Sequence, residues 1–412
     1  MNSMANRPSS LAGSPVEKPV VGIPVFVGLA LIFGAGLFVL TQEVMHRPDL
    51  WGVLLTGLIL AIAASIPAVV LVIYLDRREP EPWWLLVIAF LWGALIATGL
   101  AIVLEGWAGE GLAAVFDESA GLVDTSQLGY QFQSPQELFT WLERAMIAPL
   151  VEEGLKAFAL ILLFLLLPTE ANSMRDGIVY GALVGLGFAV VESAAFITTG
   201  YASTGSAEYL GQLIPRFVLF GVNGHPLYSA LFGAALGWAR QSTSYGKVRK
   251  GLIIGGGFLL ALAGHAMSNA FGPFALAAFA SVSGAEGTVT AAQLWLLDLV
   301  TVLATNGWVY LVVGYLATRS GYWELEICRS ELAAERPPVI TPDEYSLVKK
   351  EGLWRLRRFP GLSRRQSAQL VRAQNELAFR RHDVRRAGAD PVSDHLVEQW
   401  RAAISELRER GV

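Results

Sequence analysis

Cysteine is almost absent from this sequence, and charged side chains are scarce. The one cysteine, Cys328, excludes an intramolecular disulfide framework and a cysteine-rich metal site. Only 16% of the residues are charged while 53% are hydrophobic, which argues against an ordinary soluble globular chain. We also find no glycine pattern typical of dinucleotide or P-loop binding, no repeat array and no nucleic-acid-binding module. The composition therefore indicates an integral membrane protein and gives no reason to expect a nucleic-acid partner.

Long apolar runs are what the sequence has instead. A hydrocarbon core about 30 Å thick needs about 20 apolar residues as a helix. Eight runs satisfy this length, and they cover residues 20–41, 51–75, 84–107, 145–167, 177–200, 212–239, 251–273 and 290–317. The first run is too long for a signal peptide and lacks a small-residue cleavage site, so we interpret it as an anchor. The predicted fold is all-α, a polytopic membrane bundle of about eight transmembrane helices.

The loops between these runs alternate in charge. Arg77 and Arg78 follow the second run, Arg175 precedes the fifth, and Arg240 follows the sixth. The loop at 108–144 contains six acidic residues and no lysine or arginine before position 144. Cytoplasmic loops of membrane proteins carry an excess of Lys and Arg. The pattern predicts a multi-pass protein of the cell membrane with both termini in the cytoplasm and the 108–144 loop outside.

The two ends of the chain differ in character from the hydrophobic part. Residues 1–19 read as a cytoplasmic N-terminal tail and 20–318 as the transmembrane domain. Residues 319–412 contain 18 of the 31 Lys and Arg residues together with 14 Asp and Glu. Helix-like stretches in this part lie around 343–358, 363–386 and 393–410. We therefore predict a small helical cytoplasmic domain at the C-terminus.

Several polar side chains interrupt the apolar runs, although an ionisable group near the bilayer centre costs about 2.5–3.5 kcal/mol on insertion scales. The fourth run contains two adjacent acids and a lysine, the fifth an acid, the sixth a histidine, and the seventh a histidine and an amide. In order, these are Glu152, Glu153, Lys156, Glu192, His225, His265 and Asn269. At 1.5 Å of rise per residue, the four antiparallel helices place them in one layer of the outer half of the membrane.

Spacing along each helix adds supporting residues to this layer. Lys156 stands four residues after Glu152 on the same helix face, so it can neutralise a carboxylate there. Phe188 precedes Glu192 by the same spacing and can shield that carboxylate from lipid. Arg216, just inside the outer end of the sixth run, is either an interfacial anchor or a carboxylate partner.

The residue types in this layer suit peptide hydrolysis. That reaction needs a base for water, a group that stabilises the oxyanion and a proton donor for the leaving amine. Glutamate, histidine and asparagine can supply all three. Two histidines with carboxylates can also hold a divalent metal, but there is no HExxH helix, so we expect no cofactor and keep a metal as the alternative.

The motifs around these residues resemble those of a known family. EEGLK begins at Glu152, FAVVE ends at Glu192, HPLYSALFG begins at His225, and HAMSN runs from His265 to Asn269. In this order they resemble the PrsW family of glutamic-type intramembrane proteases, which is related to the CAAX prenyl proteases. YLDRREPEPWWLL after the second run is also similar, so the resemblance covers roughly residues 70–275.

The resemblance implies roles for the individual residues. Glu152 would activate water, Glu192, His225 and His265 would complete the centre, and Asn269 would assist at the oxyanion. We add Glu153 to this candidate catalytic set and treat Lys156, Phe188 and Arg216 as supporting residues.

The expected function is cleavage of a membrane-anchored protein near the outer face. The resembled family includes a protease that cuts membrane-bound anti-sigma factors and so begins regulated intramembrane proteolysis. Two alternatives remain. A proton-coupled transporter would string polar groups across the whole membrane, and an inactive scaffold would bind membrane segments without cutting them. The sequence leaves the substrate and the oligomeric state open.

Overall fold

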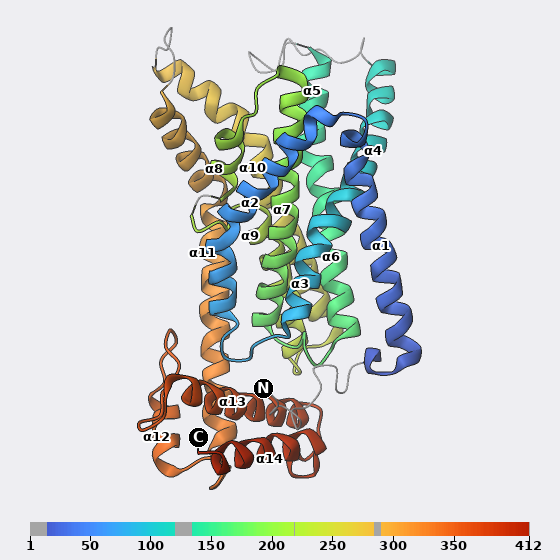
Figure 1. Ribbon diagram of the computed structural model, residues 1–412. Coiled ribbons are helices and arrows are strands. Elements are labelled where there is room, and N and C mark those ends of the chain that lie inside the picture. Colours follow the sequence, from blue (N-terminus) through green and yellow to red (C-terminus); the bar gives the residue numbers. More distant parts are fainter. Residues whose placement is uncertain (1–14, 120–133, 218, 284–289, 412) are drawn as a thin grey trace.

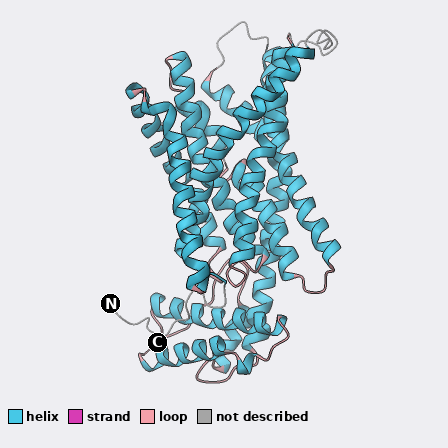
Figure 2. Ribbon diagram, turned by 90° about the vertical axis from the view of Figure 1, so that its right-hand side faces the viewer, coloured by secondary structure: helices cyan, strands magenta, loops and turns pink. Residues whose placement is uncertain are grey.

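The structure is a computed structural model that describes residues 15–119, 134–217, 219–283 and 290–411. Within these residues every regular element is a helix. Figures 1 and 2 show a bundle of long helices that stands on a smaller group of helices near the C-terminus. The all-α prediction is confirmed.

The helices follow one another along the described parts of the chain. Their bounds are η1 (Pro15–Glu17), α1 (Pro19–Met45), α2 (Pro48–Leu75), α3 (Trp83–Leu91), the π-helix η2 (Trp92–Ala97), α4 (Thr98–Ser119), α5 (Pro135–Leu142), the π-helix η4 (Glu143–Ile147), α6 (Ala148–Leu166), α7 (Met174–Thr204), α8 (Tyr209–Phe217), α9 (His225–Gln241), α10 (Lys247–Ser283), α11 (Ala291–Leu332), α12 (Pro342–Lys350), α13 (Arg364–Arg386), η5 (Pro391–Ser393) and α14 (His395–Glu409).

Six helices in the described residues are long and apolar enough to cross a membrane: Pro19–Gln42, Pro48–Leu75, Trp83–Gly111, Met174–Thr204, Lys247–Phe271 and Trp295–Leu332. Two of the eight predicted runs are missing from this set. The run at 145–167 forms α6, but its two glutamates and its lysine lower its apolar character. The run at 212–239 is not one continuous helix, since it divides into α8 and α9.

The break between α8 and α9 has a backbone cause. Leu219, Phe220, Gly221 and Gly224 all have positive φ angles, between 56° and 75°, which end the right-handed helix. Irregular backbone at membrane depth is tolerated where it is buried in protein or lines a cavity. The break places His225 at the first position of α9 rather than in the middle of a helix.

Helix α7 stands in the middle of the bundle (Figure 1) and is buried along most of its length. A methyl group added at Gly181 would lie 2.2 Å from the backbone oxygen of Ser229 in α9, and one at Gly187 would lie 1.9 Å from that of Phe90 in α3. Such small residues let membrane helices approach backbone to backbone. The glycines of α7 therefore bring α3 and α9 into direct contact with it.

The C-terminal helices are continuous with the bundle. α11 extends through residue 318 without a break, so the last predicted run and the start of the charged segment form one helix of 42 residues. Thr341, Ser363 and Asp394 each accept backbone N–H groups with their side chains at the starts of α12, α13 and α14. α13 and α14 match the predicted stretches, whereas α12 ends at Lys350, earlier than expected.

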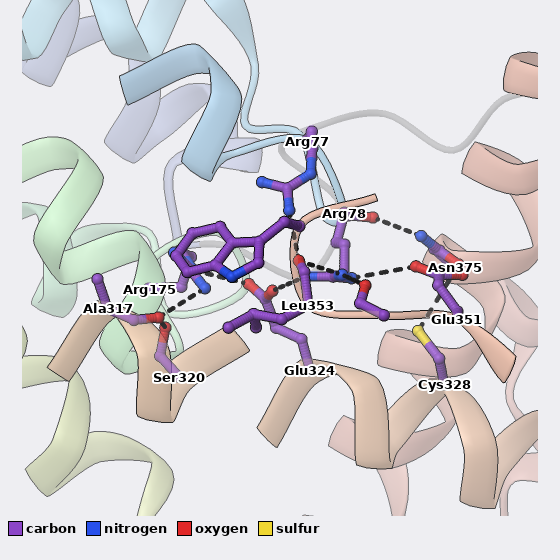
Figure 3. Close-up of polar contacts among 12 residues, drawn as sticks. Arg77, Arg78, Arg175, Ala317, Ser320, Glu324, Cys328, Glu351, Leu353 and Asn375 are labelled. Carbon is purple, nitrogen blue, oxygen red and sulfur yellow. Dashed lines mark hydrogen bonds and ion pairs between the residues drawn. The ribbon is translucent and has the colours of Figure 1, made fainter. Parts of the chain in front are cut away.

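Arg78 is the centre of the contact between the α2–α3 loop and the C-terminal helices (Figure 3). Its guanidinium lies 3.5 Å from a carboxylate oxygen of Glu324 in α11 and 3.2 Å from one of Glu351. It also donates to the backbone oxygen of Leu353 at 2.7 Å, while Asn375 of α13 donates to the Arg78 backbone oxygen at 3.0 Å. These contacts hold the C-terminal helices against one end of the bundle.

The start of α7 is fixed at the same end. Arg175 lies 3.1 Å from Glu324, and the Asn172 amide donates to Asp383 of α13 at 3.3 Å. Arg240 at the end of α9 donates to the backbone oxygen of Pro168 at 3.4 Å. The basic loops that the sequence assigned to one side of the membrane thus lie together, on the side of the C-terminal helices.

We expect the fold to lose stability at alkaline pH because of Asp76, which lies in the loop between α2 and α3. Burial, reinforced by the charges of Asp176 and Glu324, raises the pKa of Asp76 to about 8, although the Glu81 N–H and Arg372 act in the opposite direction. A carboxyl whose pKa is raised on folding stabilises the fold below its unfolded pKa, and that stability is lost as pH rises through about 8. The melting temperature should therefore fall between pH 6 and pH 9 by less in Asp76→Asn than in the wild type. Equal falls would contradict this assignment.

Candidate active site

Lys156 lies at the centre of the polar cluster inside the bundle. Its Nζ is 3.0 Å from Glu152 Oε2, 3.0 Å from Glu153 Oε1 and 2.8 Å from His225 Nδ1. The Phe188 ring covers the ammonium, with its centroid 3.6 Å from Nζ. A lysine ammonium has three N–H donors, so these three acceptors satisfy all of them.

The two histidines approach the glutamates from different helices. His265 Nδ1 of α10 lies 3.1 Å from Glu153 Oε1, and its Nε2 lies 4.0 Å from Glu152 Oε2. The rings of His225 and His265 meet edge to face at 4.8 Å between centroids. All five residues of the cluster are buried, and His225, the most accessible, is 8% exposed. They are Glu152, Glu153, Lys156, His225 and His265. The layer expected from sequence is thus one compact, buried cluster.

Glu192 connects the cluster to Arg216. Its Oε2 lies 3.0 Å from His225 Nε2 and 3.6 Å from Arg216 Nε. In the neutral tautomer whose Nδ1 accepts from Lys156, His225 carries its hydrogen on Nε2 and donates it to Glu192. Arg216 is therefore a carboxylate partner in this structure. Phe188 packs on the His225 ring at 4.8 Å between centroids, in addition to covering Lys156.

Asn269 is the one predicted site residue that the structure does not bring to the cluster. Its amide donates to the backbone oxygen of Arg144 at 2.9 Å, within the π-helix η4 that precedes α6. It joins α10 to η4.

A second polar network adjoins His265 and was missed from sequence. Tyr228 of α9 stacks on the His265 ring at 5.2 Å between centroids, and its hydroxyl donates to Asn306 of α11 at 2.7 Å. The Asn306 amide in turn donates to Asn223 at 3.2 Å. An asparagine in the eighth apolar run was a signal that could have indicated this network, but one uncharged polar residue is weak evidence.

Four residues of the cluster could hold a metal ion. Glu152, Glu153, His225 and His265 each offer one oxygen or nitrogen atom, and these four atoms lie within 4.8 Å of one another. Carboxylate oxygen and imidazole nitrogen are common ligands of Zn²⁺ and related ions. The chemistry of this set of atoms fits a divalent cation.

Local backbone geometry sets the positions of the ligands. Glu152 and Glu153 lie near the start of α6, directly after the π-helix η4. His225 begins α9, and a methyl group added at Gly185 of α7 would lie 2.2 Å from its backbone oxygen. Since only glycine permits this approach, α7 and α9 bring Glu192 and His225 together.

A helical bundle with several membrane-length helices and a buried acid and histidine cluster defines a multi-pass membrane protein with a candidate hydrolytic centre. The family described as PrsW family intramembrane metalloprotease matches residues 81–303, which is more than half of the chain. The chain belongs to this family. All the predicted site residues lie inside the match, whereas α1, α2 and the C-terminal helices lie outside it.

Two relatives carry the name Protease PrsW. The one from Oceanobacillus iheyensis is 26% identical over 210 residues, which is 50% of this chain and 80% of the relative. The one from Geobacillus kaustophilus is 28% identical over 181 residues, which is 43% of this chain and 65% of the relative. No solved structure matches the chain. Both relatives indicate peptidase activity for this part of the chain.

Proposed function

We propose that this chain is an intramembrane endopeptidase that hydrolyses a peptide bond of a membrane-anchored protein near the extracytoplasmic face. The observation that carries the proposal is the buried cluster of Glu152, Glu153, His225 and His265 inside the matched region. Membership in a family of intramembrane proteases supports the reaction class.

The depth of the cluster supports cleavage near the outer face. Glu192 follows the start of α7 by 18 residues and His265 follows the start of α10 by 18, or roughly 27 Å of helix in each case. His225 lies 16 residues before the end of α9, roughly 24 Å. All three distances are measured from the end of the bundle that contacts the C-terminal helices. Because the hydrocarbon core is about 30 Å thick, residues this far from that end are expected in the opposite half of the membrane.

Glu152 is the proposed base. Its contacts to the cluster use Oε2, and the 4.0 Å between this atom and His265 Nε2 suits a bridging water. If His265 donates Nδ1–H to Glu153, Nε2 is an acceptor and can align the second hydrogen of that water. Glu152 would take a proton as the water oxygen bonds to the carbonyl carbon. It would return that proton to the nitrogen as the C–N bond breaks.

The remaining residues position these groups. Glu153 orients His265, while Glu192, held by Arg216, orients His225. Lys156 offsets the negative charge of two adjacent carboxylates. If a divalent ion binds, Glu152, Glu153, His225 and His265 would hold it, and it would polarise the peptide carbonyl as a Lewis acid.

The proposed substrate is a protein with a single membrane span, and an anti-sigma factor is the class that family resemblance favours. A membrane anchor would hold the peptide bond at the depth of the cluster.

A proton-coupled transporter is the competing function, because discontinuous helices such as α8 and α9 also form transporter sites. Only the protease generates new chain ends.

New protein N-termini are therefore the expected signature. Cells making the wild type and cells making Glu152→Gln at equal levels would be compared by mass spectrometry of membrane-protein N-termini. We expect termini near the extracytoplasmic end of one or a few single-span proteins in the wild type and their loss in the variant. Identical sets of termini, with both proteins abundant in the membrane, would favour a transporter or a scaffold.

A further inference from the structure

The cation that the cluster already contains is the ammonium of Lys156. Its side chain is fully buried, and Glu152 and Glu153 accept two of its three N–H donors. His225 Nδ1 lies 2.8 Å from Nζ and accepts the third in the tautomer whose Nδ1 is unprotonated. Burying a charge costs free energy unless it is paired and hydrogen-bonded. Lys156 meets both conditions, and the Phe188 ring face adds a cation–π contact.

Three of the residues that bind or contact this ammonium are also among those that could bind a metal. Lys156 contacts Glu152 Oε2, Glu153 Oε1 and His225 Nδ1, and these three residues belong to the four that could ligate a divalent ion. Each contact uses a lone pair that a metal would need. In addition, a dication placed among these atoms would lie close to the lysine charge, and the two would repel each other strongly at low dielectric.

We propose that the Lys156 ammonium is the resident cation of this ligand set and that it competes with any divalent metal for Glu152, Glu153 and His225. A metal can bind with all four ligands only when the ammonium leaves its place above the Phe188 ring. The wild-type site thus binds divalent ions weakly, and removal of the lysine charge converts it into a tight metal site. This proposal deepens the proposed function, but metal binding tests it without any cleavage assay.

The test compares Zn²⁺ affinity in purified full-length protein. Lys156→Met keeps an unbranched apolar chain and removes the charge, Lys156→Arg keeps the charge, and Lys247→Met removes an exposed lysine at the start of α10. Zn²⁺ dissociation constants would come from competition with a chromophoric chelator, and Co²⁺ absorption would report tetrahedral ligation. We expect Lys156→Met to bind Zn²⁺ about 100-fold more tightly than the wild type and Lys247→Met to match the wild type.

A second substitution identifies the ligands. Adding His265→Gln to Lys156→Met should abolish most of the gained affinity, because it removes one of the four ligands. If Lys156→Met folds only when Zn²⁺ is supplied during purification, the dication has replaced the lysine charge, which also supports the proposal.

Two results would overturn the inference. One is a wild-type protein that retains one Zn²⁺ per chain through gel filtration in metal-free buffer, since the ammonium would then not exclude the metal. The other is a folded Lys156→Met that binds Zn²⁺ no more tightly than the wild type. If Lys156→Met folds neither with nor without Zn²⁺, the measurement of Zn²⁺ retained by the wild type decides alone. Failure of the peptidase proposal would leave both readouts unchanged.

Discussion

Replacement of Arg78 by methionine is expected to lower the free energy of unfolding by about 3–5 kcal/mol, the usual cost of removing one partner from a buried ion pair. Only 1% of the Arg78 side chain is exposed, and it pairs with both Glu324 and Glu351. Arg175 and Arg357 would still neutralise part of the two carboxylates. The hydrogen bond to the Leu353 backbone oxygen would be lost as well.

Thermal unfolding in detergent, with protease digestion of the C-terminal helices as a second readout, would measure this effect. Arg365→Met is the matched control, because Arg365 is exposed at the start of α13. Surface substitutions usually change stability by less than about 0.5 kcal/mol. If Arg78→Met were as stable and as protease-resistant as Arg365→Met, the contact would not be holding the C-terminal helices in place.

Substitution of Glu153 by glutamine is expected to lower the cleavage rate by about 100-fold, the usual cost of misplacing a catalytic group. Glu153 fixes the His265 ring and pairs with Lys156. A glutamine can keep one hydrogen bond, but it loses the charge that balances the ammonium. His265 would then lose the orientation that points Nε2 toward Glu152.

Pulse-chase labelling of a substrate found from its new N-terminus would measure the rate in cells. Glu110→Gln is the control, since Glu110 is an exposed carboxylate of α4 at the end of the membrane-length helix Trp83–Gly111. The variant and the control should reach equal levels in the membrane. Cleavage by Glu153→Gln at the rate of Glu110→Gln would remove Glu153 from the proposed mechanism.

Hydrophobicity and the local spacing of residues were sufficient to predict the positions of most of the membrane-length helices. Apolar runs of membrane length predicted the positions of α1, α2, α3–α4, α7 and α10, because each helix must satisfy its backbone hydrogen bonds internally. The break at 219–224 could not be predicted in the same way. Leu219 and Phe220 adopt positive φ against their own preference, and no local sequence pattern indicates that conformation.

The candidate site was easier to predict than its details. Charged residues in membrane helices are expensive and so indicate where polar groups meet, which led to Glu152, Glu192, His225 and His265. The spacing of residues along a helix does not determine which group each side chain contacts. Asn269 follows His265 by one helical turn, yet its amide donates a hydrogen bond to the backbone of η4. Neutral Asn306 carries no comparable cost, so its contact with Tyr228 was found only in the structure.

The docking of the C-terminal helices also required the structure. In the sequence, Arg78 and Arg175 indicated only which loops share a side of the membrane. In the structure both pair with Glu324, and Arg78 also pairs with Glu351, residues about 150 to 270 positions away along the chain. Pairings between such distant segments have no local pattern. The contact reaches the start of α7, the helix that carries Glu192, so the C-terminal helices fix one end of a helix whose other half contributes to the site.

New termini in cells could arise from a second protease, so the most direct test of the central claim uses purified components. Wild type and Glu152→Gln would each be reconstituted into liposomes with one single-span substrate identified in cells, and the products would be sequenced by mass spectrometry. The account predicts one cut near the extracytoplasmic end of the span with wild type and none with the variant. An uncut substrate in the presence of folded wild type, or equal cutting by both proteins, would contradict the claim that this cluster hydrolyses peptide bonds.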